Sequence, residues 1–459
     1  MPALEHAAPP IKPAAPRLNR PFVVALMLAN FGTNVALIAP IQNILPRMVE
    51  SATGSADKAL GLGLVTGLGA FAALVVNPLA GHYSDRWVST DNRAVTVLIG
   101  LVTGGVAHAV LGWQHSLVGI ALWWTLCQAT INIAYSPMSA VVVDHVDRRS
   151  WGLVWGLISV AQALGLIIGF AAVVFVFPTV TAGMVAISVG YVVCLFPLLL
   201  VLYRLPRVSY PSASAIASGP AVSGSPGAGA AGAETVAARG AGLRALLSAG
   251  QGFGLVWLGK FLVVLAETVA LLYLYYYLQD VVHYGNPSQG QLILVLTATV
   301  AVIIATVAVG RMADRSGGYR RYAVLSALLM AATGFALAGF ALWAVVVACA
   351  FVLGAGYGAF LSVSQALSNV VLPDPASAGR DLGIINIAAA VPQVIGAPIA
   401  GLVVAGAGGY RGLFVFAGLL ALAAAAVFTR VPSQQAPAVA DPRPAANDGR
   451  EPALSPPAA

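Results

Sequence analysis

The stretch Gly81-His82-Tyr83-Ser84-Asp85-Arg86, which closes at Arg93, is a short polar run between two apolar segments. A related run, Gly310-Arg311-Met312-Ala313-Asp314-Arg315, lies in the second half of the chain and closes at Arg320 and Arg321. Each run has a glycine, an aspartate four residues later and then an arginine. A polar motif that returns after half the chain predicts a duplicated unit of transmembrane helices.

The composition requires a membrane environment. Of the 459 residues, 59% are hydrophobic and 8% are charged, whereas about a quarter are charged in soluble domains. An aqueous fold cannot bury so much apolar surface. The net charge of +7 is distributed over short loops, which disfavours nucleic-acid binding. Cys127, Cys194 and Cys349 lack the spacing of a metal or redox site, so we expect buried thiols.

Twelve apolar segments approach the roughly 20 residues that a spanning helix needs. They are Phe22–Ile44, Leu60–Leu79, Ala94–Leu111, Leu117–Val143, Gly152–Phe177, Ala182–Tyr203, Phe253–Leu278, Leu292–Val309, Tyr322–Leu342, Val345–Leu372, Gly383–Ala405 and Leu413–Phe428. We therefore expect an all-α membrane protein with two pseudo-symmetric six-helix bundles, residues 22–203 and 251–430. Residues 1–21 form a cytoplasmic N-terminal segment, 204–250 a cytoplasmic linker, and 431–459 a disordered cytoplasmic tail.

The distribution of basic residues predicts the orientation. With the N-terminus inside, most Lys and Arg fall in inner segments, and the outer loops keep only Arg47, Lys58 and Arg411. Both termini are therefore expected in the cytoplasm, and the protein in the bacterial inner membrane. The first apolar segment has no obvious cleavage site and is expected to be retained.

A second set of matched residues supports the duplication. The pairs are Asp144 with Asp374, Arg149 with Arg380, Gly152 with Gly383, Gln162 with Gln393 and Gly165 with Gly396. Their offset stays close to that of the two opening loops, which disfavours chance similarity.

Two parallel six-span halves, each with a G-x-x-x-D-R loop after its second span, resemble the major facilitator superfamily of secondary transporters. The resemblance covers roughly Phe22 to Arg430. Within that superfamily, the run Pro373–Ile387, with Pro392 and Gln393, is similar to the glycoside–pentoside–hexuronide and sucrose-type symporters. The segment Trp87–Asn92 departs from those families, which usually have Gly and several Arg there.

The resemblance also bears on drug/proton antiporters of the superfamily. Those proteins typically carry an Arg in the fourth span and a Gly-Pro pair in the fifth. The corresponding segments here are Trp123–Gln128 and Gly165-Leu166. Both absences weigh against that antiporter class without excluding efflux.

Two charged side chains, Lys260 and Glu267, fall well inside the predicted spans, both in the seventh. An ionisable group at membrane depth is costly unless it faces protein or a water-filled cavity. Burial favours the protonated carboxyl, so Glu267 is our candidate for proton coupling. The alternative is a permanently protonated or paired Glu that helps helices associate. For Lys260 we expect one of two roles: it contacts substrate, or its side chain extends toward the cytoplasmic end of the span.

Amide side chains are the uncharged candidates for a substrate cavity. They occur one turn apart, on one helix face, in spans one, four and ten: Asn30, Asn34, Gln128, Asn132, Gln365 and Asn369. The resemblance implies that spans one, four, seven and ten line the cavity, where amides would suit a hydroxyl-rich ligand. The alternative is hydrogen bonding between helices, which we favour for Gln162 and Gln393.

Aromatic and histidine side chains have simpler interpretations. His108 is expected to be a hydrogen-bonded core residue. Tyr273, Tyr275, Tyr276 and Tyr277 are expected to belong mostly to an interfacial aromatic belt, although one ring could close the cavity or stack on a sugar.

The family resemblance gives the opening loops a conformational role. It implies a cytoplasmic latch between the halves when the cavity faces outward, and its residues would be Gly81, Asp85, Arg86, Asp144, Gly310, Asp314, Arg315 and Asp374. In this arrangement Arg86 pairs with Asp144, and Asp85 lies near the helix start at Gly383. The alternative is that these charges only set topology.

These features predict a secondary transporter that moves a small polar solute, sugar- or glycoside-like, by H⁺-coupled symport. Na⁺ coupling is the less favoured choice, and we expect a monomer without cofactor or bound metal. The first alternative is efflux of a drug-like or secondary metabolite, and the second is a non-transporting sensor. An enzyme is disfavoured because no span end carries a cluster of catalytic side chains.

The latch leads to a kinetic prediction. Asp85→Asn should slow turnover more than it weakens substrate binding, because the loop acts on the conformational change. Turnover and affinity measured in proteoliposomes test this, and a pure loss of affinity would count against the latch.

Overall fold

The computed structural model describes residues 20–86, 92–146, 150–177, 179–204, 251–370, 378–406 and 408–432, and within these ranges it contains helices and no strands. Among the described residues, eleven segments are long and apolar enough to cross a membrane, and the first, Arg20–Gly81, has 62 residues. At about 1.5 Å per residue this segment would extend about 90 Å, three times the hydrocarbon thickness. It is too long for one crossing, and the non-helical residue Gly54 divides it into two, so the predicted all-α fold of twelve spans is confirmed.

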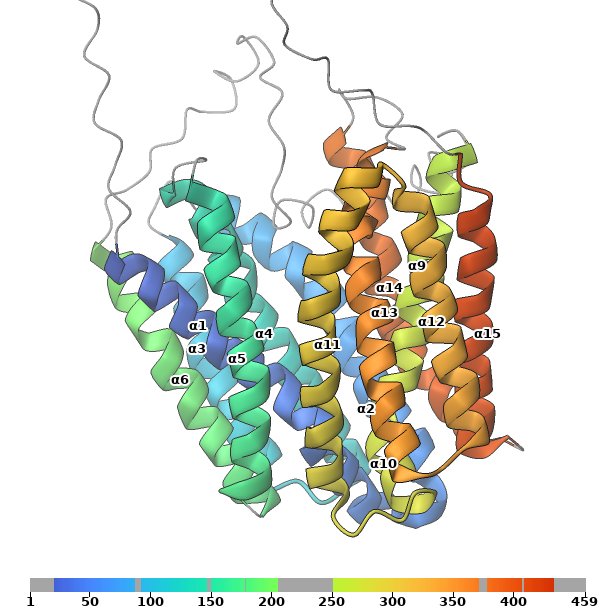
Figure 1. Ribbon diagram of the computed structural model, residues 1–459. Helices are drawn as coiled ribbons and strands as arrows, with labels where there is room; N and C mark the ends of the chain where they lie inside the picture. The colour runs from blue at the N-terminus through green and yellow to red at the C-terminus, as the bar shows by residue number, and fades with distance from the viewer. Residues whose placement is uncertain are drawn as a thin grey trace, which may run out of the picture.

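The helices fall into two sets that flank the predicted linker, which lies outside the described residues, as do residues 1–19 and the tail from 433 (Figure 1). The N-terminal half contains α1 (Arg20–Ala39), η1 (Pro40–Ile44), α2 (Leu45–Arg86), α3 (Asn92–Leu111), α4 (Leu117–His145), α5 (Trp151–Phe175) and α6 (Val180–Arg204). The C-terminal half contains α9 (Gln251–Leu272), α10 (Leu274–Asp280), α11 (Pro287–Ser316), α12 (Tyr319–Gly339), α13 (Trp343–Val370), α14 (Ala378–Ala405) and α15 (Gly409–Thr429).

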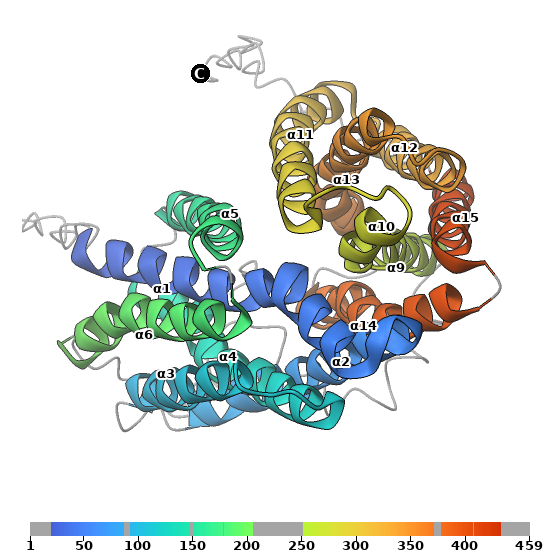
Figure 2. The same ribbon diagram turned by 90° about the horizontal axis from the view of Figure 1, so that it is seen from below.

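Helix packing repeats between the halves. The pairs α1–α5, α2–α4 and α1–α6 of the N-terminal half correspond to α9–α14, α11–α13 and α9–α15 of the C-terminal half. The contacts between the halves are also symmetric, because the second span of each half packs on the fifth span of the other. These pairs are α2 with α14 and α11 with α5 (Figure 2). The repeated loops of the sequence therefore belong to a repeated packing arrangement.

Two local breaks shape one end of the molecule. Gly54 has φ 75° and ψ 179°, a conformation that only glycine adopts readily, so α2 consists of two limbs. The predicted span Phe253–Leu278 is also not one helix, because Tyr273 (φ −99°, ψ 11°) separates α9 from α10. We call the end that carries residues 42–59 and 273–291 the closed end; it is the lower end in Figure 1.

Small residues allow the two halves to approach closely near the closed end. A Cβ atom on Gly63 of α2 would lie 2.7 Å from the Ala397 carbonyl oxygen of α14. A Cβ atom on Gly401 of α14 would lie 2.9 Å from the Ala59 carbonyl oxygen of α2. Such distances are below normal contact, so the α2–α14 packing requires glycine on both helices.

The α2–α14 packing leads to a prediction that needs no substrate. Gly63→Val should reduce the population of the closed end about tenfold, because the branched side chain overlaps Ala397. Spin labels on the exposed positions Ser55 and Gln289, in a background without the native cysteines, should report longer distances. Gly156→Val in α5 is the matched control, since a Cβ there meets no atom within 4 Å. Unchanged distances in Gly63→Val would refute the packing requirement.

Candidate functional site

A cavity of about 340 Å³ lies between the two halves. The N-terminal half supplies Ile38, Gln42 and Leu166. The C-terminal half supplies the other lining residues, which are Glu267, Ala270, Leu271, Leu274, Leu294, Val295, Ala298, Thr299, Val302, Leu337, Val346, Ala350, Leu353, Gly354 and Tyr357. The walls are therefore mostly aliphatic.

Glu267 is the only acidic or basic side chain among the described residues that line this cavity. It comes from α9, six residues before the break at Tyr273. Among the described residues it has no hydrogen bond or ion pair, and the other polar lining side chains are Gln42, Thr299 and Tyr357. A carboxyl group in aliphatic surroundings can exchange a proton or accept a hydrogen bond from a solute.

The predicted amides of spans one and four do not line this cavity. Asn30 is 5% exposed; it donates to the Leu26 carbonyl at 2.9 Å and accepts from Gln162 of α5 at 3.1 Å. This is the alternative role, hydrogen bonding between helices. Asn34 lies on the same helix against α5, where its Cβ faces Gly165. The predicted cavity role of this pair thus has no support in this conformation.

The span-four pair packs between helices. Asn132 donates to the Gln128 carbonyl at 2.8 Å within α4, and both residues are at least 91% buried. The Gln128 side chain lies against Gly69 of α2. Lys260, one span-seven candidate, is half-buried and also lies outside the cavity lining.

Several predicted residues cannot be placed at the level of side chains. The side chains of Gln365, Asn369, Asp85, Arg86 and Asp144, and all of Asp374, lie outside the described parts of the structure. Gly81 lies in α2 and Gly310 in α11, as the paired loops require. Asp314 accepts a hydrogen bond from Tyr319 of its own half at 3.0 Å, and Arg315 is exposed. The latch remains a prediction.

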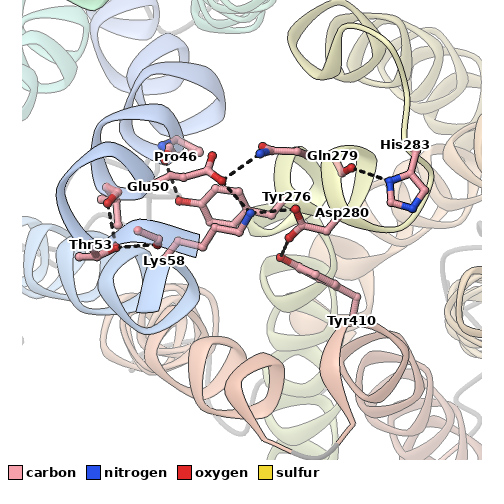
Figure 3. A network of polar contacts seen from close by, with 11 residues as sticks. Pro46, Glu50, Thr53, Lys58, Tyr276, Gln279, Asp280, His283 and Tyr410 are labelled. Carbon is pink, nitrogen blue, oxygen red and sulfur yellow. Dashed lines mark hydrogen bonds and ion pairs between the residues drawn. The ribbon is translucent and has the colours of Figure 1, made fainter. Parts of the chain in front are cut away.

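The closed end contains a buried cation shared by both halves (Figure 3). The Lys58 ammonium lies 2.9 Å from Glu50 in the same half and 2.8 Å from Asp280 on α10, and its side chain is 5% exposed. It also lies 4.7 Å from the centre of the Tyr276 ring. The turn at Gly54 brings Lys58 back onto Glu50, and Asp280 accepts a further hydrogen bond from Tyr410 at 2.7 Å.

Tyrosine and amide side chains extend this contact. The Tyr273 hydroxyl donates to the Ala59 carbonyl at 2.8 Å, and the Tyr276 hydroxyl donates to the Pro46 carbonyl at 2.7 Å. Gln279 donates to Glu50 at 2.9 Å (Figure 3). The predicted interfacial belt is therefore wrong for the four tyrosines, which are at most 8% exposed. Tyr273 and Tyr276 are bonded to the opposite half, whereas Tyr277 donates to the Leu337 carbonyl of its own half.

Sequence reasoning missed the role of Lys58, which it counted as an outer-loop charge. Its partner Asp280 is 222 residues away, so no local pattern joins them. The usable signal was the position of Glu50, Lys58 and Asp280 at the same predicted membrane face. By contrast, His108 is confirmed as a core histidine, since its ring nitrogens lie 2.8 Å from the Gly104 carbonyl and 3.2 Å from the Ala36 carbonyl.

Comparisons with known proteins agree with this architecture. The sequence model of the Major Facilitator Superfamily matches residues 256–456. A search of curated proteins by sequence gives no match. This match lies in the C-terminal part of the chain and covers less than half of it.

Three solved structures share the fold over most of the chain. The nucleoside transporter NupG (D323A mutant) is 13% identical with a TM-score of 0.69, and the match covers 89% of this chain and 99% of NupG. The xylose transporter XylE from E. coli, in a partially occluded inward open conformation, is 13% identical with a TM-score of 0.62, and the match covers 91% of this chain and 99% of XylE. The POT family transporter PepTSo is 14% identical with a TM-score of 0.66, and the match covers 90% of this chain and 98% of PepTSo.

The shared cation leads to a prediction at the closed end. Asp280→Asn should lower the population of the closed end about tenfold, because Lys58 loses its charged partner in the opposite half and keeps Glu50. The spin-label pair at Ser55 and Gln289 measures this population.

The matched control is Asp57→Asn, which removes an exposed carboxylate from the same limb of α2. It should leave the distance distribution unchanged. If both variants behave alike, the Lys58–Asp280 pair does not hold the end closed.

Proposed function

We propose that the chain is a proton-coupled secondary transporter of the major facilitator superfamily that moves a small amphipathic solute by alternating access. The observation that carries the proposal is the position of Glu267 in an aliphatic cavity between the halves. The same segment, α9–α10, continues from Glu267 to the closed end at Asp280. A proton or solute at Glu267 thus lies on the element that contacts the opposite half.

The cavity favours a solute with a largely apolar body. Aliphatic side chains from both halves form most of its wall, and they gain little from contact with hydroxyl groups. Glu267, Thr299 and Tyr357 can orient one polar group of the solute. A donor on the solute would suit the Glu267 carboxyl. This chemistry fits a drug-like or secondary metabolite, the solute of the first alternative function predicted from the sequence.

H⁺-coupled symport of a sugar-like solute is the second candidate. It is favoured by the match to the xylose transporter and by the symporter-like segment Pro373–Ile387. The structural matches bear on several solute classes, since the three solved structures are named as nucleoside, xylose and POT family transporters. One fold hosts many substrates, so the cavity carries more weight than the match.

The orientation is part of the proposal. Arg20, Arg93, Arg204, Arg320 and Arg430 lie at helix ends opposite the closed end. The closed end carries Arg47, Lys58 and Arg411. The positive-inside rule then places the closed end outside and both termini in the cytoplasm, in the bacterial inner membrane. The structure would thus represent a state closed to the outside.

A proteoliposome screen with an imposed pH gradient tests the function. Glu267→Gln should abolish uphill accumulation of the solute, because the amide cannot carry the proton, and should leave counterflow exchange, because the amide oxygen still accepts a hydrogen bond. Accumulation should fall at least about tenfold, to the equilibrium level.

Two outcomes would contradict this assignment. Uphill accumulation by Glu267→Gln would exclude Glu267 as the coupling group. Equal loss of accumulation in Asp57→Asn, which changes an exposed carboxylate at the closed end, would show a general effect of removing a negative charge.

A further inference from the structure

Gln42 occupies a distinct position in the cavity wall. The N-terminal half contributes three lining residues, and Gln42 is the polar one among them. It lies in η1, the π-helix Pro40–Ile44, whose backbone closes from the Leu45 N–H to the Pro40 carbonyl. Such wide turns are costly and recur at functional sites, because they shift side chains out of the α-helical register.

One side of the Gln42 amide is already occupied. Its oxygen Oε1 accepts a hydrogen bond from Nε2 of Gln291 on α11, at 2.8 Å. Gln291 is completely buried, and its own oxygen has no partner among the described residues. This hydrogen bond between two side-chain amides connects the two halves and fixes the direction of the Gln42 amino group.

The amino group of the Gln42 side chain is available to donate a hydrogen bond. The Gln42 amino group makes no hydrogen bond with any described residue, and the side chain is partly exposed to the cavity. An amino group with an occupied neighbouring oxygen acts as a donor. The cavity therefore has an acceptor at Glu267 on the C-terminal half and a donor at Gln42 on the N-terminal half.

We infer that Gln42 is a specificity-determining residue that donates a hydrogen bond to an acceptor, such as a carbonyl oxygen, on the transported solute. This inference rests on the proposed function and narrows its solute to an amphipathic molecule with a donor at one end and an acceptor at the other. The solute then bridges the halves through polar groups. A ligand can shift the balance between conformations only if it interacts differently with them, which a bridging contact provides.

Two probe molecules separate recognition from closure. They are N-(diethylaminoethyl)benzamide and the corresponding diethyl(phenylbutyl)amine, which share the phenyl ring and the amine and differ in the amide group. The affinity of full-length protein for each is measured by titration in proteoliposomes, together with accumulation driven by a pH gradient. The ratio of the two affinities isolates the amide contact, because any effect on closure applies to both probes.

The wild-type protein should bind the benzamide about tenfold more tightly than the amine. Gln42→Ala should reduce this ratio to about one. Gln291→Ala removes the amide that orients the Gln42 amino group and should give an intermediate ratio, above one and below the wild-type value. Gln289→Ala, at an exposed amide of the same helix, should match wild type.

Each other outcome overturns a defined statement. If Gln42→Ala keeps the wild-type ratio, or if wild type binds both probes equally, Gln42 does not donate a hydrogen bond to the solute acceptor. If wild type accumulates both probes and Glu267→Gln does not, the proposed function stands even when the Gln42 inference fails. If wild type binds and accumulates neither probe, the proposed amphipathic solute fails, and the inference fails with it.

Discussion

One buried cation, shared between two carboxylates, joins the two halves at the closed end. Lys58 is nearly inaccessible, so it must be paired to remain charged, and its partners come from different halves. When the halves separate, Lys58 still has Glu50 and Asp280 still has Tyr410. Each charged group thus keeps a hydrogen-bonding partner in its own half. The contact can therefore break without leaving an isolated buried charge, which a reversible closure requires.

The break at Tyr273 connects this closure with the cavity. Glu267 lies before the break, on α9, and the side chains that contact the N-terminal half lie at or after it, on Tyr273 and α10. The hydroxyl groups of Tyr273 and Tyr276 donate to backbone carbonyls of residues 59 and 46. A change at Glu267 that displaces α9 would move donors whose geometry is strict. The proposed proton site and the closed-end contacts thus share one segment of 30 residues, α9 and α10 with Tyr273.

The sequence predicts the large-scale fold because lipid imposes it. Long apolar segments and repeated polar loops mark the twelve spans, and the repeat of Asp85 at Asp314 marks the two halves. The pairing across halves is not encoded locally. Asn30 and Gln128 look like cavity amides in sequence, yet close packing against α5 and α2 takes them out of the cavity. The tyrosines of α10 look interfacial because each has a polar tip, but they are buried inside the protein. Tyr276 is bonded to the N-terminal half and Tyr277 to the Leu337 carbonyl of its own half.

The two halves contribute unequally to the cavity wall, and this difference bears on the transport mechanism. The C-terminal half supplies most of the lining, so it can hold the apolar body of a solute in either conformation. A solute held by one half alone would bind both conformations equally and would not shift their balance. The N-terminal half presents Ile38, Gln42 and Leu166, and a hydrogen bond to Gln42 is directional where the aliphatic contacts are not. Because Gln42 is also hydrogen-bonded to Gln291 near the closed end, the residue that we propose to bind the solute takes part in the contact between the halves.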